Sequence, residues 1–374
     1  MRALDIPLLV VTVVLCALGG LVLDSATAHQ LAWSPEVVRQ TAAMGVGLLV
    51  MLACWRVSPA MLRKLAPFLY LVAVAGLVLV RIPGIGQLSH GARRWISLGP
   101  FGAFQPSEPA KLFLLLAVAT LLTRRPDPST RLSTALGALL LLAVPCGLIM
   151  LQPDLGTALV LCGTTLALLI VSGTSPVLLL ALGTGGLAAA PYFMHDYQKA
   201  RLMTYLNPQA DPMGSGYNLL QAQTAVGSGQ LFGTGLFTGP MSQHGFVPEN
   251  WTDFIFTVVG EEMGFVGCIG FLALYAVLIG LLVRTALMAR DRFDMLLASG
   301  VAAMLALHVL VNVGMVLSLL PATGFPLPFA SYGGTAVVTH MAALGLAMGV
   351  YRRYHETSED LWGMRTAVPW ASIP

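Results

Sequence analysis

Ten apolar segments, each about long enough to cross a lipid bilayer, dominate this sequence. They lie near 6–24, 37–55, 66–82, 109–123, 133–151, 155–172, 175–193, 263–283, 295–318 and 333–350. A run of about 20 apolar residues forms a helix that spans the hydrocarbon core, and a helix satisfies its own backbone hydrogen bonds there. The pattern therefore predicts an all-α, polytopic membrane protein with about ten transmembrane helices.

The composition agrees with lipid as the main solvent. Hydrophobic residues make up 56% of the 374 residues and charged residues only 10%, whereas a soluble domain carries roughly 25% charged residues. The formal net charge of +3 gives no sign of a nucleic-acid-binding surface, so no nucleic-acid partner is expected. The five cysteines show no CxxC spacing and are interpreted as packing residues.

The basic residues predict an orientation. With the N-terminus inside, most of the 20 Lys and Arg residues fall in loops on the cytoplasmic side, as the positive-inside rule expects. Both termini are then cytoplasmic, and the protein is predicted to be a multi-pass protein of the cytoplasmic (inner) membrane. We expect a ten-helix transmembrane domain, 1–354, followed by a short cytoplasmic tail, 355–374.

Two outer loops depart from a plain helical bundle. The loop 83–108 and the long loop 194–252 are dense in Gly, Pro and polar residues, and they hold the cations Arg93, Arg94, Lys199 and Arg201. Turn formers at this density predict an ordered extracellular structure, with a short surface helix near 219–226. Cations beside the outer leaflet would suit an anionic headgroup, although a long loop also translocates regardless of its charge.

Ionisable residues at the outer ends of the helices are the candidate functional groups, because charges in membrane helices are costly. Glu108 and Lys111 lie at i, i+3 and are expected to pair, either as a structural salt bridge or with a direct role. Asp154 and Asp253 each precede an apolar run, where an aspartate often serves as a helix N-cap. Local sequence alone favours that structural interpretation for Asp253.

Two histidines lie in apolar runs, His308 and His340. Interhelical hydrogen bonds are the favoured interpretation for both, ahead of catalysis. The residues alone therefore leave two functions open: an enzyme that acts on a lipid-linked anion, and a transporter.

Five motifs in chain order resemble the SEDS family, the group of RodA, FtsW and SpoVE. They are GARRWI with QPSEPAK (91–96 and 105–111), QPDLGT (152–157), NPQADP with GYN (207–212 and 216–218), TDFIF with GEE (252–256 and 260–262), and PATGFPLPFASYGG (321–334). The third motif and the short N-terminus make the resemblance greatest to RodA, the elongation member. Departures from the family pattern at Gln230, Thr234, Trp251 and Ser318 touch none of the acidic residues.

The resemblance implies a peptidoglycan glycosyltransferase that polymerises lipid II on the outer face of the membrane. The transfer from an undecaprenyl diphosphate donor would invert the configuration, in cell-wall elongation and cell-shape maintenance. A class B penicillin-binding protein, a transpeptidase, is the implied protein partner. The family's essential aspartate in the fourth outer loop corresponds to Asp253.

The chemistry assigns a role to each candidate residue. Asp253 would be the catalytic general base for the acceptor hydroxyl. The leaving diphosphate needs cations, for which the candidates are Arg93, Arg94, Lys199 and Arg201. Mg²⁺ or another divalent cation is an open alternative, its ligands are unknown, and no organic cofactor is expected. A supporting polar network would comprise Glu108, Lys111 and Asp154, while lipid tails, of the substrate and of membrane lipids, would lie in grooves between helices.

Two other functions remain in competition. A lipid II flippase would need a polar path through the full membrane, whereas the intramembrane charges gather at the outer ends of the helices. A non-catalytic scaffold for the penicillin-binding protein would need Asp253 only as a cap, and the intact set of acidic residues argues against it.

Overall fold

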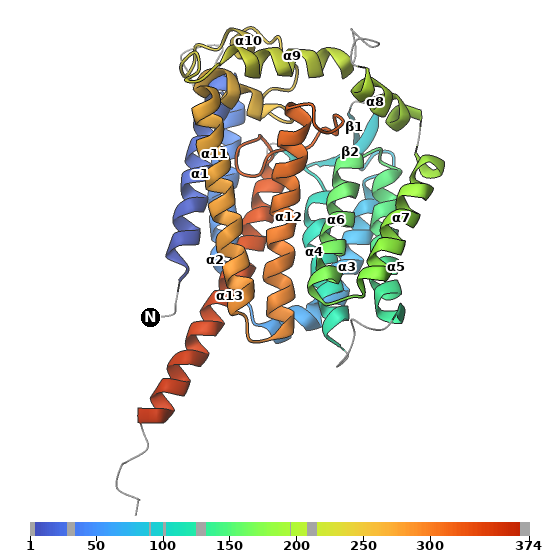
Figure 1. Ribbon diagram of the computed structural model, residues 1–374, viewed down its shortest axis with the longest axis vertical. Helices are drawn as coiled ribbons and strands as arrows, with labels where there is room; N and C mark the ends of the chain where they lie inside the picture. Colours follow the sequence, from blue (N-terminus) through green and yellow to red (C-terminus); the bar gives the residue numbers. More distant parts are fainter. Residues whose placement is uncertain are drawn as a thin grey trace, which may run out of the picture.

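The computed structural model describes residues 4–27, 34–89, 91–99, 102–124, 132–194, 196–207 and 215–366. The ten predicted segments correspond to ten of its helices: α1 (Ile6–Thr27), α2 (Pro35–Trp55), α3 (Pro59–Leu79), α4 (Ser107–Thr123), α5 (Leu132–Met150), α6 (Leu155–Val171), α7 (Pro176–Phe193), α11 (Ile255–Met288), α12 (Arg292–Val316) and α13 (Gly334–Thr366). Seven of these, namely α1, α2, α3, α5, α11, α12 and α13, are long and apolar enough to cross a membrane. They stand together in one bundle (Figure 1), so the chain is a mostly helical, polytopic membrane protein, as predicted.

Serine caps set the beginnings of α2 and α3. The hydroxyl of Ser34 accepts a hydrogen bond from the Val37 amide, and that of Ser58 accepts one from the Met61 amide, each at 3.3 Å. A proline follows each serine at the start of the helix. The cap satisfies an amide that has no partner inside the helix, and proline has no amide to satisfy. Local sequence therefore fixes the breaks between the first three apolar segments.

Helices α12 and α13 form the centre of the bundle. Of the most apolar stretch of each helix, 67% of α12 and 72% of α13 is buried, against 22% for both α2 and α3. Helix α12 contacts α4, α6, α11 and α13. Large apolar residues such as Leu71 and Leu140 are exposed on outer helices, which is the surface expected where the surroundings are lipid tails.

A small antiparallel sheet is the one addition to the helical prediction in the described residues. Strands β1 (Gly86–Ser89), β2 (Ala92–Ser97) and β3 (Ala103–Phe104) pair in the order β1-β2-β3 within the loop 83–108. Gly91 and Gly102 have φ angles of +76° and +94° at the turns, a conformation that glycine adopts without steric cost. Strands this short carry little periodicity, so hydropathy could not reveal them.

The long loop 194–252 is ordered where the structure describes it, as predicted. It contains α8 (Asp196–Leu206), α9 (Ser215–Ser228) and α10 (Pro240–Gln243), and α9 includes the expected surface helix near 219–226. These helices lie across the end of the bundle that also carries the sheet (Figure 1); we call this the loop end, and the other the far end. Residues 208–214, which include most of the NPQADP motif, lie outside the described residues.

Two buried carboxylates on α11 tie the long loop to the bundle. Glu261 accepts hydrogen bonds from the backbone amides of Met241 at 2.7 Å and Ser242 at 2.8 Å. Glu262 accepts one from the hydroxyl of Ser25 on α1 at 2.6 Å and one from the Phe237 amide at 3.2 Å. The GEE motif therefore anchors the loop 229–243, which accounts for both glutamates without a metal.

Replacing Glu262 with alanine is expected to destabilise this anchor. The Ser25 hydroxyl and the Phe237 amide would lose their shared acceptor in a buried setting, which costs about 1–3 kcal/mol. We expect a lower melting temperature of the purified protein and faster proteolysis within 229–243. Gln223→Ala, at an exposed position of α9, is the control and should leave both unchanged; equal behaviour of the two variants would contradict this anchoring role.

The predicted division between residues 354 and 355 falls within α13. This helix continues to Thr366, and residues 367–374 lie outside the described residues. A separate cytoplasmic tail therefore stays a prediction.

Candidate active site

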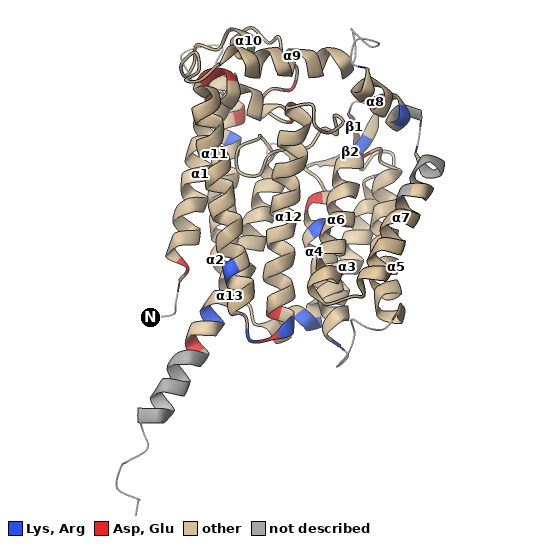
Figure 2. Ribbon diagram, viewed as in Figure 1, with Lys and Arg blue, Asp and Glu red and all other residues tan. Residues whose placement is uncertain are grey.

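Charged residues gather at the two ends of the bundle (Figure 2). At the loop end, Asp253 lies two residues before the first residue of α11. The N-cap of α11 is Phe254, and no side chain caps this helix. The capping role that local sequence favoured for Asp253 is therefore wrong. By contrast, Asp154 does cap α6, because its two carboxylate oxygens accept from the Thr157 amide at 3.0 Å and the Thr157 hydroxyl at 2.9 Å.

The carboxylate of Asp253 lies against the backbone of the segment 321–329. A Cβ atom on Gly324 would lie 3.0 Å from Asp253 Oδ2, and the φ angle of Gly324 is +66°, so only glycine fits here without strain. Within the part of the chain that the structure describes, no residue donates a hydrogen bond to the Asp253 carboxylate. Its oxygens are therefore available to a substrate.

A buried asparagine on α12 holds Asp253 in place. The side-chain amide of Asn312 donates to the backbone carbonyl of Asp253 at 2.7 Å and to that of Phe325 at 2.5 Å. It thus joins the segment before α11 to the segment 321–329. The sequence offered no signal for Asn312, because its two partners are distant in the chain and meet only in the fold.

Electrostatics raise the pKa of the Asp253 carboxyl. The main cause is desolvation of the carboxyl by the surrounding protein. The negative charges of Glu249 and Asp154 raise the pKa further, while the positive charges of Arg201 and Arg94 lower it. The result is a pKa of about 7, instead of the ordinary value near 3.9. A carboxyl with this pKa suits proton abstraction at neutral pH.

Two of the four predicted phosphate-binding cations lie near Asp253. The guanidinium of Arg94 donates to the carbonyls of Gln152, at 2.7 Å, and of Pro153, directly before Asp154. The guanidinium of Arg201 donates to the Ala322 carbonyl at 3.0 Å, two residues before Gly324. Both arginines therefore hold loops of the site and act on the charge of Asp253.

The other two predicted cations are placed differently. The guanidinium of Arg93 donates to the Gly86 carbonyl at 2.7 Å, across the β1–β2 pair rather than to a loop beside Asp253. Lys199 is exposed on α8 and forms no hydrogen bond or ion pair with the described residues around Asp253. The geometry therefore favours Arg94 and Arg201 over Arg93 and Lys199.

The predicted pair of Glu108 and Lys111 is buried beneath this site. Lys111 Nζ lies 2.8 Å from Glu108 Oε1 and 2.9 Å from Nε2 of His308 on α12. His308 Nδ1 donates to the Met304 carbonyl at 2.6 Å, so Nε2 accepts from the lysine. Lys111 also lies 4.8 Å from the ring centre of Phe325, which places this network directly under the segment 321–329.

The polar network in the structure has different members from the predicted one. Among the described residues, no hydrogen bond joins Asp154 to Glu108 or Lys111, while His308 is a member that sequence analysis assigned only to helix contacts. The predicted interhelical hydrogen bond is confirmed for His308. It is wrong for His340, whose Nδ1 bonds the Ala336 carbonyl of its own helix at 2.7 Å.

An apolar groove of about 980 Å³ lies between α2, α3, α4 and α13 and reaches the sheet. Its walls include Val46, Leu69, Phe113 and Val338, and Phe104 of β3 lies at its sheet side. A groove of this size and composition can accept a lipid tail, since small-molecule pockets range from about 300 to 1,000 Å³.

The membrane-spanning helices and the apolar groove that reaches the sheet define a membrane protein with space for a lipid chain beside a charged region. The chain belongs to the FtsW/RodA/SpoVE family, described as cell cycle protein, whose sequence pattern matches residues 6–356. It is 38% identical over 352 residues to the peptidoglycan glycosyltransferase MrdB of Escherichia coli K12, with 93% of each chain covered.

Solved structures agree with this assignment. One is a chain of a peptidoglycan synthase complex that coordinates polymerization and crosslinking; it is 35% identical, with a TM-score of 0.81, over 95% of this chain and 100% of that one. The rod shape determining protein RodA of Thermus thermophilus is 34% identical, with a TM-score of 0.71, over 94% of this chain and 98% of that one. The protein is thus a peptidoglycan glycosyltransferase, as the motifs predicted.

Proposed function

We propose that this protein polymerises lipid II at the loop end, on the outer face of the cytoplasmic membrane, with Asp253 as the general base. The observation that carries the proposal is the Asp253 carboxylate itself. It accepts no hydrogen bond from the described residues, its pKa is about 7, and the charges of Arg94 and Arg201 act on it. A residue that served only to cap α11 would have none of these properties.

The proposed reaction is a single displacement at the donor sugar. The acceptor's 4-hydroxyl oxygen attacks the anomeric carbon, its proton passes to the Asp253 carboxylate, and the bond to the diphosphate oxygen breaks. The α linkage of the donor becomes a β-1,4 linkage, and the undecaprenyl diphosphate leaves with the electron pair. General-base catalysis of this kind contributes typically 10²–10⁴-fold to a rate.

Arg94 and Arg201 are the proposed partners of the leaving diphosphate. A guanidinium has five N–H donors, so it can donate to a backbone carbonyl and to a phosphate oxygen at the same time. It can also bind a phosphate in a bidentate manner. Their carbonyl bonds fix them before substrate arrives, which limits the reorganisation needed during reaction. Arg93 and Lys199 remain weaker candidates for contacts with the same group.

The lipid tail of the substrate is proposed to enter the apolar groove between α2, α3, α4 and α13. The groove reaches the sheet that holds Arg94, so a tail in the groove and a diphosphate at the loop end are compatible with one bound molecule.

The rate of polymerisation is expected to depend on the protonation of Asp253. Below a pH of about 7 the carboxyl is protonated and cannot accept the hydroxyl proton, so the rate should fall about tenfold per pH unit on the acid side and level off above pH 7. Glu249→Gln should move this profile to lower pH, because it removes a negative charge that raises the pKa of Asp253. Initial rates across the pH range would measure both effects, and a flat profile in acid would contradict them.

A divalent cation is proposed to bind the diphosphate and to stabilise it as the leaving group. Among the described residues there is no group of three or more His, Cys, Asp or Glu side chains that could hold a metal. Mg²⁺, however, usually keeps several waters and is bound largely through substrate phosphates, so the diphosphate would supply most of its ligands and Asp253 would stay free to act as the base. The ion would supply positive charge to the leaving group.

Removal of divalent cations with EDTA is accordingly expected to lower polymerisation at least tenfold, and added Mg²⁺ should restore it. The comparison requires saturating lipid II, with protein melting measured in the same buffer to exclude unfolding. Full activity in EDTA would remove the cation from the proposal.

A class B penicillin-binding protein is the proposed partner, with a role in cell-wall elongation and cell shape. The similar chain in a synthase complex with coordinated polymerization and crosslinking supports this, as does the likeness to a rod shape determining protein. Cytoplasmic termini and a site on the outer face belong to the same proposal and rest on the positive-inside pattern.

Purified protein tests the proposal directly. Lipid II is supplied with and without the partner, whose transpeptidase is blocked and whose own glycosyltransferase domain, if present, is inactivated. Glycan product supports the polymerase. Movement of lipid II across vesicle membranes without any product would support a flippase instead, and neither activity would support a scaffold.

A further inference from the structure

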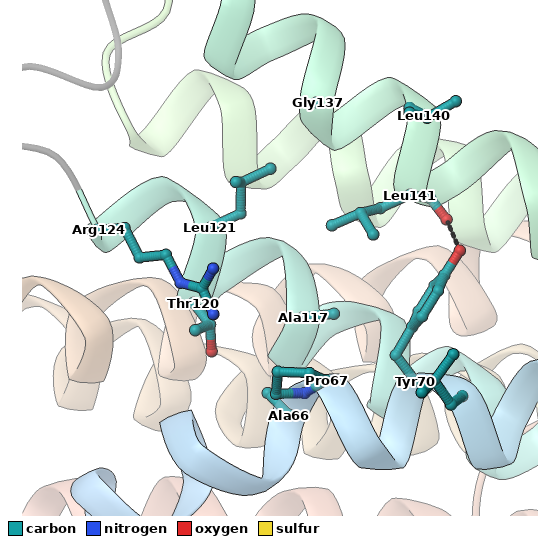
Figure 3. A pocket seen from close by; sticks show the side chains of 11 residues that line it. Ala66, Pro67, Tyr70, Ala117, Thr120, Leu121, Arg124, Gly137, Leu140 and Leu141 are labelled. Atoms are coloured by element: carbon teal, nitrogen blue, oxygen red, sulfur yellow. Dashed lines mark hydrogen bonds between the residues drawn. The ribbon is translucent and has the colours of Figure 1, made fainter.

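A second cavity, of about 420 Å³, lies between α3, α4 and α5 and shares no lining residue with the apolar groove. Small residues on all three helices create it, namely Ala66 and Pro67 on α3, Ala117 on α4 and Gly137 on α5 (Figure 3). Because these positions carry little side-chain volume, the three helices cannot fill the space between them.

The wall of this cavity offers a ligand almost nothing but van der Waals contact. The Tyr70 hydroxyl donates to the Leu141 carbonyl at 3.0 Å (Figure 3), and the Thr120 hydroxyl donates to the Leu116 carbonyl at 2.7 Å. Both hydroxyls are therefore already satisfied. In a membrane, the apolar ligand that reaches a cavity between outer helices is an acyl chain.

One cation, Arg124, lines the far-end side of the cavity, and a second, Lys64, lies nearby on α3. The exposed Arg124 follows the last turn of α4, and its guanidinium points toward Thr120 at the cavity wall (Figure 3). Lys64 is exposed and lies three residues before Pro67, on the same face of α3 and one turn nearer the far end. Within the described ranges, neither side chain forms a hydrogen bond or an ion pair.

Three other arginines at the far end are neutralised by carboxylates. Arg63 pairs with Asp291, Arg284 with Asp5 at 2.5 Å, and Arg353 with Asp294 at 2.7 Å. Figure 2 shows acidic and basic residues side by side at this end. Lys64 and Arg124 differ from these three arginines: Arg124 lines the cavity, and Lys64 lies one helical turn from Pro67 in its wall.

We propose that this cavity binds an anionic phospholipid of the leaflet at the far end. One acyl chain occupies the space between α3, α4 and α5, and the headgroup phosphate lies between Lys64 and Arg124. Basic pockets between membrane helices suit anionic headgroups, and a zwitterionic lipid is less suited because its ammonium group opposes the two cations. The bound lipid holds α3 against α4 and α5 at the end opposite Asp253, separately from the substrate.

The test uses the full chain, purified and stripped of lipid in detergent. Dioleoyl phosphatidylglycerol is expected to raise its melting temperature saturably and to bind at least tenfold more tightly than dioleoyl phosphatidylcholine. Arg124→Gln and the double variant Lys64→Gln/Arg124→Gln should lose this preference. Arg56→Gln, which removes the same charge from an exposed position at the same end, should keep it. Ala117→Phe fills the cavity and should abolish saturable binding of both lipids.

Three results would overturn the proposal: equal binding of both lipids to the wild type, an unchanged preference in the double variant, or an equal shift with glycerol 3-phosphate alone. The last would mean that the site takes a soluble phosphate. The charge variants lie at the surface, so they keep the test decisive even if Ala117→Phe does not fold.

Discussion

Asp253→Ala and Asp253→Asn are both expected to lower the lipid II polymerisation rate by roughly 10²–10⁴-fold. The reason is loss of the group that removes the acceptor proton, since asparagine preserves the shape of the side chain but cannot act as a base at neutral pH. Melting temperatures should stay close to that of the wild type, because the carboxylate accepts no hydrogen bond from the described residues and does not cap α11. Product formation by the purified variants, with the partner present, measures the effect.

Glu249→Gln is the matched control for this experiment. It removes a carboxylate four residues away that also acts on the site electrostatically, yet it leaves the proposed base in place. Its maximal rate should remain near the wild-type value even though its pH profile shifts. A folded Asp253→Asn protein that polymerises at the wild-type rate would show that Asp253 is not the base.

The two aspartates show where sequence reasoning reaches its limit. Asp154 and Asp253 stand in the same local setting, each before an apolar run, and local rules predict an N-cap for both. Only the fold separates them: Asp154 bonds Thr157 within its own first turn, whereas Asp253 faces Gly324 of a distant segment. Family motifs singled out Asp253 as the catalytic candidate, but they gave no physical reason for the difference.

The helices could be predicted because a membrane imposes two simple requirements on every segment that crosses it. A spanning segment must be apolar and must satisfy its own backbone, so each helix is visible in its own residues. The sheet and the polar contacts could not be predicted in this way, because they depend on partners elsewhere in the chain. This holds for the strands, which have four, six and two residues, and for a residue such as Asn312. The Glu108–Lys111 pair was predictable at i, i+3, whereas its extension to His308 required the packing of α4 against α12.

Lys111→Met is expected to destabilise the protein by about 3–5 kcal/mol, the usual cost of removing one partner of a buried ion pair. Methionine fills a similar volume, so the loss is electrostatic: the Glu108 carboxylate keeps its burial without its cation, and His308 Nε2 loses its donor. Polymerisation should fall as well, because Lys111 also packs on the Phe325 ring, next to Gly324 and Asp253. Thermal unfolding and product formation would be measured on the same preparation.

The double variant Glu108→Gln/Lys111→Met separates charge from packing. With no uncompensated charge left in the interior, it should be more stable than Lys111→Met alone, since a neutral pair in place of a buried ion pair is often tolerated. The two single variants and the double variant form a cycle whose interaction energy reports the coupling of the pair. If the double variant is as unstable as the sum of the two single ones, the pair is not coupled, and the network does not support the segment beside Asp253 through charge.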